Sequence, residues 1–233
     1  GEMRGRLRAL GIEGVAARTF HAAALAQVNY FWPQIARDTA PGIIDNKVRM
    51  LAHASDSLKL NLDRAALRDI ASRIEARKVS MRSIEQDAAV LTEGVGGLSI
   101  EKYVDLSRAY EKLKDERRQM DFEDVLLACA GMLEAEPRVA TAVHEQYRHF
   151  TVDEFQYVSP LQNRLLELWL GERRDICVVG DASQTIYSFA GADPKYLLEF
   201  PTRFEDTYQV RLERNYRSDP AILAVTRYDD NSS

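Results

Sequence analysis

The sequence contains only two cysteines among its 233 residues, Cys129 and Cys177, which lie far apart in apolar surroundings. It has no Cys-x-x-Cys pair and no Cys/His cluster, so a structural zinc site is not expected. Two buried free thiols in a reducing cytosol are the default interpretation. An apolar run of about 18 residues is also missing, so we expect no membrane span. We expect no secretory leader or transit peptide either.

The chain also lacks a basic charge excess, because its net charge is −5. The bulk charge therefore gives no indication of a nucleic-acid partner. The remaining composition, 45% hydrophobic and 29% charged, is typical of a globular domain with a buried core. A soluble cytoplasmic domain is the first interpretation, and no internal repeat or low-complexity segment changes it.

The chain changes character twice along its length. Residues 15–21, "VAARTFH", are typical of a short strand, and residues 28–120 show helical periodicity without strand signals. Asp63 and Ser99 are expected to cap two of these helices. The apolar positions that follow the two caps lie on one face of each helix: Leu67, Ile70 and Ile74, then Tyr103, Leu106, Tyr110 and Leu113.

After residue 120, strands and helices alternate. Helices are predicted to begin after Asp121, at Pro137 and after Ser159, and strands are predicted near 150–155, 175–181 and 208–215. Apolar strands separated by helices indicate an α/β fold with a parallel sheet that helices cover. Such sheets bind ligands beyond the carboxyl ends of their strands. Asp153-Glu154 and Gly180-Asp181 lie at two such ends.

The acidic pair in "FTVDEF" suits magnesium and water chemistry. One carboxylate at a strand end can hold Mg²⁺, and a neighbouring one can orient or deprotonate an attacking water. By itself the pair is weak evidence, since adjacent acids occur by chance and usually face solvent. A position directly after an apolar strand favours the functional interpretation.

Two later segments carry further candidates. In "VVGDASQTIYSFAGAD", Gln184 follows the next strand end, and Tyr187 and Phe189 could stack on bases. In "RLERNYRSDP", Arg217 could bind a phosphate and Tyr216 could face a purine. The alternatives are core aromatics and a solvated arginine, and each segment alone is weak evidence.

Together, "TFHAAAL", "VDEFQYVSPLQ", "VVGDASQTIYSFAGAD" and "LERNYRS" closely resemble, in this order, successive motifs of superfamily 1 DNA helicases of the UvrD/Rep/PcrA family. Within that family, the segment "DASQTIYSF" resembles a divergent UvrD paralogue. The resemblance implies a RecA-like parallel sheet flanked by helices. Residues 1–27 and 121–228 would form the first motor domain, 28–120 an inserted all-helical subdomain, and 229–233 a frayed tail.

The resemblance also implies roles in ATP hydrolysis. Asp153 would hold Mg²⁺ and Glu154 would activate the hydrolytic water. Gln184 would contact the γ-phosphate, Arg217 would act as an arginine finger, and Tyr216 would stack on adenine. The segment "DFEDVL", residues 121–126, resembles a further family motif, but we interpret its acids as helix caps and assign no site to it.

For DNA, the resemblance implies contacts from Thr19, His21, Tyr187 and Phe189 along a single strand. The implied activity is ATP-driven 3′-to-5′ movement on single-stranded DNA and at single/double-strand junctions, in repair or replication. Its place would be the bacterial cytoplasm, near the nucleoid. Two alternatives stay open: a non-catalytic DNA-binding or interaction module, and the helicase subunit of a nuclease complex.

Some family features are missing. Tyr157 replaces an Asp, Ala190 replaces a basic residue, and Ala22 stands where Ser is frequent. No Gly-Lys pair occurs, so the phosphate-binding loop GxxxxGK[ST] is absent. We therefore expect the chain to be a fragment that lies between the phosphate-binding loop and the second motor domain, and to be inactive alone.

Overall fold

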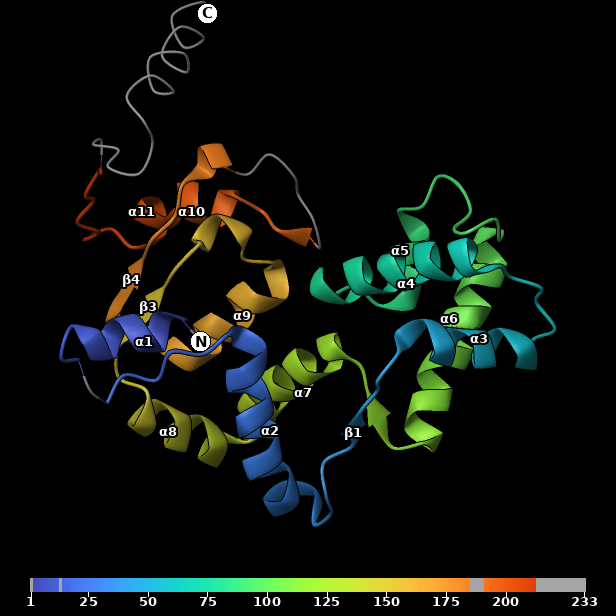
Figure 1. The fold of residues 1–233 in the computed structure, drawn as a ribbon, viewed down its shortest axis with the longest axis horizontal. Coiled ribbons are helices and arrows are strands. Elements are labelled where there is room, and N and C mark those ends of the chain that lie inside the picture. The colour runs from blue at the N-terminus through green and yellow to red at the C-terminus, as the bar shows by residue number, and fades with distance from the viewer. Residues whose placement is uncertain (1, 13, 185–190, 213–233) are drawn as a thin grey trace, which may run out of the picture. The chain divides into compact units, whose positions relative to one another are not determined.

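A computed structural model describes residues 2–12, 14–184 and 191–212 (Figure 1). The chain divides into two units, Gly1–Leu198 and Glu199–Ser233. The first unit contains, in order, α1 (Glu2–Ala9), α2 (Phe20–Ala36), β1 (Gly42–Ile43), α3 (Lys47–Ser57), α4 (Arg64–Val79), α5 (Ile84–Ala89), α6 (Ile100–Glu116), β2 (Gln119–Met120), α7 (Phe122–Ala135), α8 (Pro137–Gln146), β3 (Phe150–Val152), the 3-10 turn η1 (Phe155–Tyr157), α9 (Pro160–Leu170), β4 (Ile176–Val178), the 3-10 turn η2 (Ala182–Gln184) and α10 (Lys195–Leu198). The second unit contains α11 (Phe200–Arg203).

Strands β3 and β4 pair in parallel, which confirms the predicted direction of these two strands. Phe150 lies opposite Ile176, and Val152 lies opposite Val178. Among the described residues, the only pairs of strands are β3 with β4 and β1 with β2, and both pairs are parallel. A mixed helical fold with small parallel sheets is compatible with the α/β class, and the larger RecA-like sheet stays a prediction. The strand expected from residue 208 is wrong for residues 208–212, which are irregular; residues 213–215 lie outside the described part.

Two expectations about strands need correction. Residues 15–19 are irregular, and α2 begins at Phe20 behind Thr19, whose hydroxyl accepts a hydrogen bond from the backbone N–H of Ala22 at 3.2 Å. The alanines that follow favour a helix more strongly than the short Thr-Phe-His run favours a strand. The segment 28–120 is not free of strands either. Its β1 pairs with β2, and Ile44 N–H donates to the carbonyl of Met120 at 2.9 Å.

The predicted helix starts are confirmed. Asp63, Ser99, Asp121 and Ser159 each accept a hydrogen bond from a backbone N–H in the first turn of the helix that follows. Asp121 and Ser159 complete capping boxes with the residues three positions later. Gly171 ends α9 at a φ of 60°, in the left-handed region that favours glycine.

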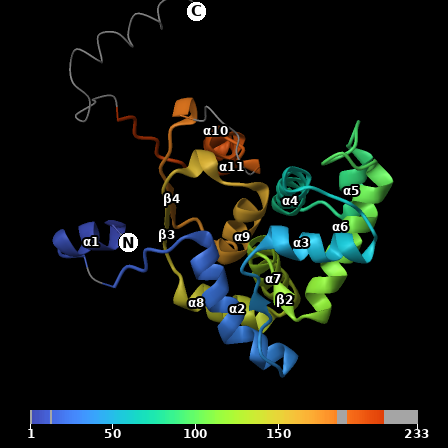
Figure 2. The same ribbon diagram turned by 45° about the vertical axis from the view of Figure 1, so that its right-hand side comes forward.

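The first core gathers around α7, which packs against α2, α8 and α9 (Figure 2). The ring of Trp169 stacks on Phe20 and on Phe150, with centroids 5.7 Å and 6.4 Å away. Its indole N–H donates to the side-chain carbonyl of Gln27 at 2.8 Å, and the thiol of Cys129 donates to the same oxygen. These contacts fix strand β3 to α2 and α9.

The second core lies among α3, α4 and α6, which group together on one side of Figure 1. Its centre is made by the fully buried side chains of Leu51, Ile70, Ile74, Tyr103, Leu106 and Tyr110. The helices predicted from the caps at Asp63 and Ser99 therefore bury the faces that their periodicity indicates. The assignment of residues 28–120 as a separate subdomain stays a prediction.

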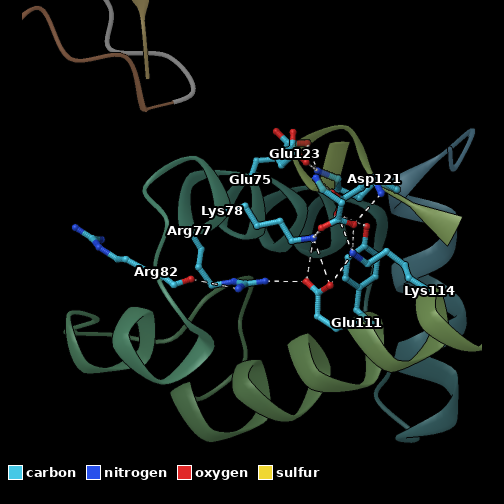
Figure 3. A network of polar contacts seen from close by, with 11 residues as sticks. Glu75, Arg77, Lys78, Arg82, Glu111, Lys114, Asp121 and Glu123 are labelled. Carbon is cyan, nitrogen blue, oxygen red and sulfur yellow. Dashed lines mark hydrogen bonds and ion pairs between the residues drawn. The ribbon is translucent and has the colours of Figure 1, made fainter. Parts of the chain in front are cut away.

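A buried charged network joins α4 and α6 to the start of α7 (Figure 3). The ammonium of Lys78 lies 2.7 Å from Asp121 and 2.6 Å from Asp124. Lys114 pairs with the same two carboxylates and with Glu111. Asp121 and Asp124 of "DFEDVL" thus cap α7, as predicted, and also anchor Lys78 and Lys114. Glu123 of the same segment makes no cap and pairs with Lys47 of α3 at 2.6 Å.

The two cysteines differ. Cys129 is fully buried, as expected, whereas Cys177 on β4 is exposed, so that prediction is wrong for Cys177. In the described part of the chain, no helix has the length and hydropathy needed to cross a membrane.

Candidate functional site

The turns that follow β3 and β4 are held together by backbone hydrogen bonds. Val179 N–H donates to the carbonyl of Val152 at 2.8 Å, and Phe155 N–H donates to the carbonyl of Val179 at 2.9 Å. Between these bonds the chain turns sharply at Glu154, whose φ of 54° is in the left-handed region. The Asp153 carboxylate accepts a hydrogen bond from the Glu154 N–H at 2.9 Å. Both acidic side chains are exposed at the end of the strand.

The turn after β4 is organised around Asp181. One of its oxygens accepts from the backbone N–H of Ser183 at 3.0 Å and from the Ser183 hydroxyl at 2.6 Å. The other accepts from the side-chain amide of Gln184 at 3.0 Å. These bonds, from Ser183 first and Gln184 second, lower the pKa of Asp181. Asp181 is therefore a carboxylate at neutral pH, and it orients Gln184.

Gln156 connects the two turns. Its side chain is completely buried; its amide nitrogen lies 2.6 Å from a carboxylate oxygen of Glu154, and its amide oxygen accepts from the N–H of Asp181 at 3.1 Å. Gly180 makes this approach possible, because a Cβ at that position would lie 2.5 Å from the amide oxygen of Gln156. The sequence prediction assigned no role to Gln156. In the sequence, the only feature that marks Gln156 is that a polar residue directly follows the apolar Phe155.

Tyr157 provides a second link between the turns. Its hydroxyl donates to the backbone carbonyl of Gln184 at 3.0 Å. Tyr157 thus ties η1 to the turn after β4 in this chain. Asp153, Glu154 and Gln184 are thus brought together through Gln156, Tyr157 and Asp181.

The predicted DNA residues that the structure describes lie at the start of α2. Thr19 caps the helix and is exposed, and the His21 ring meets Phe122 edge-on with centroids 5.3 Å apart. Burial lowers the pKa of His21, so its imidazole is neutral at pH 7. Within the described residues, no hydrogen bond or ring contact connects Thr19 or His21 to the acidic turns. Four predicted site residues lie outside the described part: Tyr187, Phe189, Tyr216 and Arg217.

The acidic turn is compatible with Mg²⁺. Over the described ranges, no Lys or Arg forms an ion pair with Asp153, Glu154 or Asp181, and no group of three or more His, Cys, Asp or Glu side chains could enclose a metal. Mg²⁺ is usually held by one or two carboxylates, with water and phosphate as its other ligands. An exposed Asp153 carboxylate at a strand end fits that mode, whereas a closed metal site of the zinc type does not occur in this part of the chain.

Polar side chains beyond the ends of parallel strands stand where proteins of the α/β class usually bind ligands. The model of the UvrD/REP helicase N-terminal domain matches residues 1–205. The chain belongs to this family, as its motifs indicate.

Similar proteins carry helicase names. The chain is 42% identical over 238 residues to the ATP-dependent DNA helicase UvrD2 of Mycobacterium tuberculosis. The aligned region covers 97% of this chain and 34% of that protein. It is 31% identical over 195 residues to UvrD1 of the same organism, covering 78% of this chain and 24% of that protein. An ATP-dependent helicase/nuclease subunit of Natranaerobius thermophilus is 32% identical over 136 residues, which are 55% of this chain and 11% of that protein. The chain thus spans about a third, or less, of the length of these relatives.

Proposed function

We propose that this chain is part of an ATP-dependent DNA helicase or translocase that moves 3′ to 5′ in DNA repair or replication. Membership of the UvrD/REP family and the names of the relatives support ATP-dependent helicase activity in general. The direction and the substrates, single-stranded DNA and single/double-strand junctions, are part of the proposal. So is a place in the bacterial cytoplasm near the nucleoid.

One observation carries the proposal: Asp153-Glu154 and Asp181-Gln184 meet at the ends of two paired parallel strands. In the proposed site Asp153 holds Mg²⁺, which neutralises phosphate charge when it is bound. Glu154 accepts a proton from the attacking water, and the Gln184 amide contacts the γ-phosphate. Arg217 and Tyr216 complete the nucleotide contacts as arginine finger and adenine platform.

DNA binding is proposed for a separate surface. At the start of α2, Thr19 is exposed and His21 is half-buried beside the Phe122 ring, which is 56% exposed. A neutral His21 would contact DNA through a hydrogen bond rather than as a cation. Tyr187 and Phe189 are proposed to stack on bases, each contributing roughly 1–3 kcal/mol.

The proposed chemistry is tested with the complete protein and its Glu154→Gln variant. This change keeps the shape of Glu154 and removes its base, so kcat for ATP hydrolysis should fall by roughly 10²–10⁴. Nucleotide affinity and single-strand binding should stay near wild type, because Glu154 acts mainly in the transition state. Glu172→Gln, which removes an exposed charge just after α9, is the matched control and should leave turnover unchanged.

The outcome also decides among the alternatives. Normal turnover in Glu154→Gln would overturn the assigned role of Glu154. A complete wild-type protein that binds DNA without hydrolysing ATP would support the non-catalytic module. A helicase subunit of a nuclease complex would instead show the predicted Glu154→Gln effect together with DNA cleavage.

A further inference from the structure

We infer that Gln156 is a positioning residue that holds the Glu154 carboxylate and the Asp181 turn in one fixed arrangement. The inference rests on the proposed function, because that function gives Glu154 the task of activating water. It adds a residue that neither the sequence motifs nor the relatives' names assign to a role.

The burial of Gln156 fixes the orientation of its amide. A buried amide needs hydrogen-bond partners at both ends, and here the two ends face opposite kinds of partner. The nitrogen donates to a Glu154 oxygen, and the oxygen accepts from the Asp181 N–H. A flipped amide would place oxygen against the carboxylate and nitrogen against the N–H, losing both bonds. Only one orientation therefore satisfies the site.

This orientation constrains Glu154. The Glu154 side chain is exposed and would otherwise sample several rotamers. Gln156 holds one carboxylate oxygen at 2.6 Å, and over the described residues no hydrogen bond occupies the other. One oxygen is thus fixed by the protein, while the second is left to accept a proton from water. Such fixed geometry is worth a large factor in rate, since misplacement by about 1 Å can cost roughly 10²-fold.

The same side chain connects Glu154 to Gln184. Gln156 binds the Asp181 N–H, and the Asp181 carboxylate binds the Gln184 amide. Tyr157 holds the Gln184 carbonyl independently from the surface. A shift of Gln184 upon phosphate binding would therefore be transmitted to the base through a continuous set of hydrogen bonds.

The test uses the complete protein with three variants: Gln156→Met, Gln156→Glu and Tyr157→Phe. DNA-stimulated ATP turnover is measured from pH 6 to pH 8, together with nucleotide affinity and thermal unfolding. Gln156→Met leaves Glu154 unrestrained, so kcat should fall about 10- to 100-fold with nucleotide affinity within about threefold. Tyr157→Phe removes one hydroxyl away from the base and should reduce kcat less.

Gln156→Glu separates positioning from a merely structural role. A side chain of nearly the same shape can donate to Glu154 only when it is protonated, and two adjacent carboxylates retain a shared proton to higher pH than one alone. Relative to wild type, kcat of Gln156→Glu should therefore be higher at pH 6 than at pH 8. This pH-dependent recovery would not arise from a general loss of folding.

If the wild type is active and the folded Gln156 variants hydrolyse ATP at the wild-type rate, this inference is overturned while the proposed function stands. A kcat ratio of Gln156→Glu to wild type that is the same at pH 6 and pH 8 would also overturn the inference. So would a failure of both Gln156 variants to fold, because the residue would then act through the fold. An inactive wild type would remove the proposed function, and this inference with it.

Discussion

Single residues in this protein differ sharply in environment even when their chemistry is the same. Cys129 is buried in the first core, where its thiol donates to Gln27, and burial raises its pKa to about 12. Cys177 lies exposed on β4. Thiol reactivity requires the thiolate and access to solvent, so the two positions should behave as opposites.

We predict one fast-reacting thiol per chain. At about pH 8, a disulfide reagent such as Ellman's reagent should modify Cys177 within minutes, and Cys129 only after denaturant is added. Cys177→Ser should remove the fast reaction, whereas Cys129→Ser should leave it intact. Two fast thiols in the folded wild type would contradict the buried position of Cys129.

At the scale of elements, glycine has opposite effects in two places. Gly131 lies within α7 at an exposed position, and a Cβ there would meet nothing within 4 Å. Gly180 follows β4, where an added Cβ would lie 2.5 Å from the Gln156 amide oxygen and 3.0 Å from Leu197. Because two hydrogen bonds hold the Gln156 amide, it has little freedom to retreat.

The two glycines therefore form a matched pair for alanine substitution. Gly131→Ala should stabilise the chain by about 0.5–1 kcal/mol, since alanine is the better helix former. Gly180→Ala should destabilise it by about 1–3 kcal/mol through overpacking. Urea unfolding of both variants against wild type measures the difference, and a neutral Gly180→Ala would show that the turn is looser than described.

For the molecule as a whole, the buried charged network is the main polar connection between the helical region and α7. Burial by itself favours neutral Asp121, but the charges of Lys78, Lys114 and Lys47 outweigh it and lower the pKa of Asp121. Burial likewise opposes the charge of Lys114, yet Asp121, Glu111 and Asp124 raise its pKa. Every charge here depends on its partners, so the loss of one member should be costly.

Two lysines of α6 that lie two positions apart can test this expected loss of stability. The side chain of Lys114 is only 3% exposed and lies among three carboxylates. The side chain of Lys112 is 78% exposed and pairs with Glu116 at 3.7 Å. Lys114→Met should destabilise the chain by about 3–5 kcal/mol, because it leaves buried carboxylates without compensation. Lys112→Met should cost less than about 1 kcal/mol. Equal shifts in the urea midpoint would refute the special position of Lys114.

The pH dependence of the same variants follows from the pKa directions. A carboxylate whose pKa is lowered on folding contributes stability above its unfolded value, about 3.9, and loses it as the pH falls. The free energy of unfolding of wild type should therefore begin to fall near pH 5 and continue to fall below pH 3, toward the lowered pKa of Asp121. Lys114→Met should show a smaller drop, since the pKa of Asp121 is lowered less without that ammonium. A steeper acid drop in the variant would reverse the assigned sign.

Helix starts and strand ends could be predicted because they depend on neighbours in the sequence. Caps such as Asp121 and Ser159 bond to groups three residues away, so the sequence determines them nearly alone. The order of the motifs likewise determined the family, which the family model confirms. The acids after β3 and β4 were found for the same reason, since an apolar run that ends in Asp is a local signal.

Only the tertiary structure decided the features that join distant residues. Thr19 became a helix cap, Cys177 became exposed, and β1 formed inside a region that shows only helical periodicity. Gln156 bridges to Asp181 across 25 positions, and Lys78 reaches Asp121 across 43. Such contacts depend on how the packed elements bring residues together, and no pattern within a few neighbouring residues carries that information.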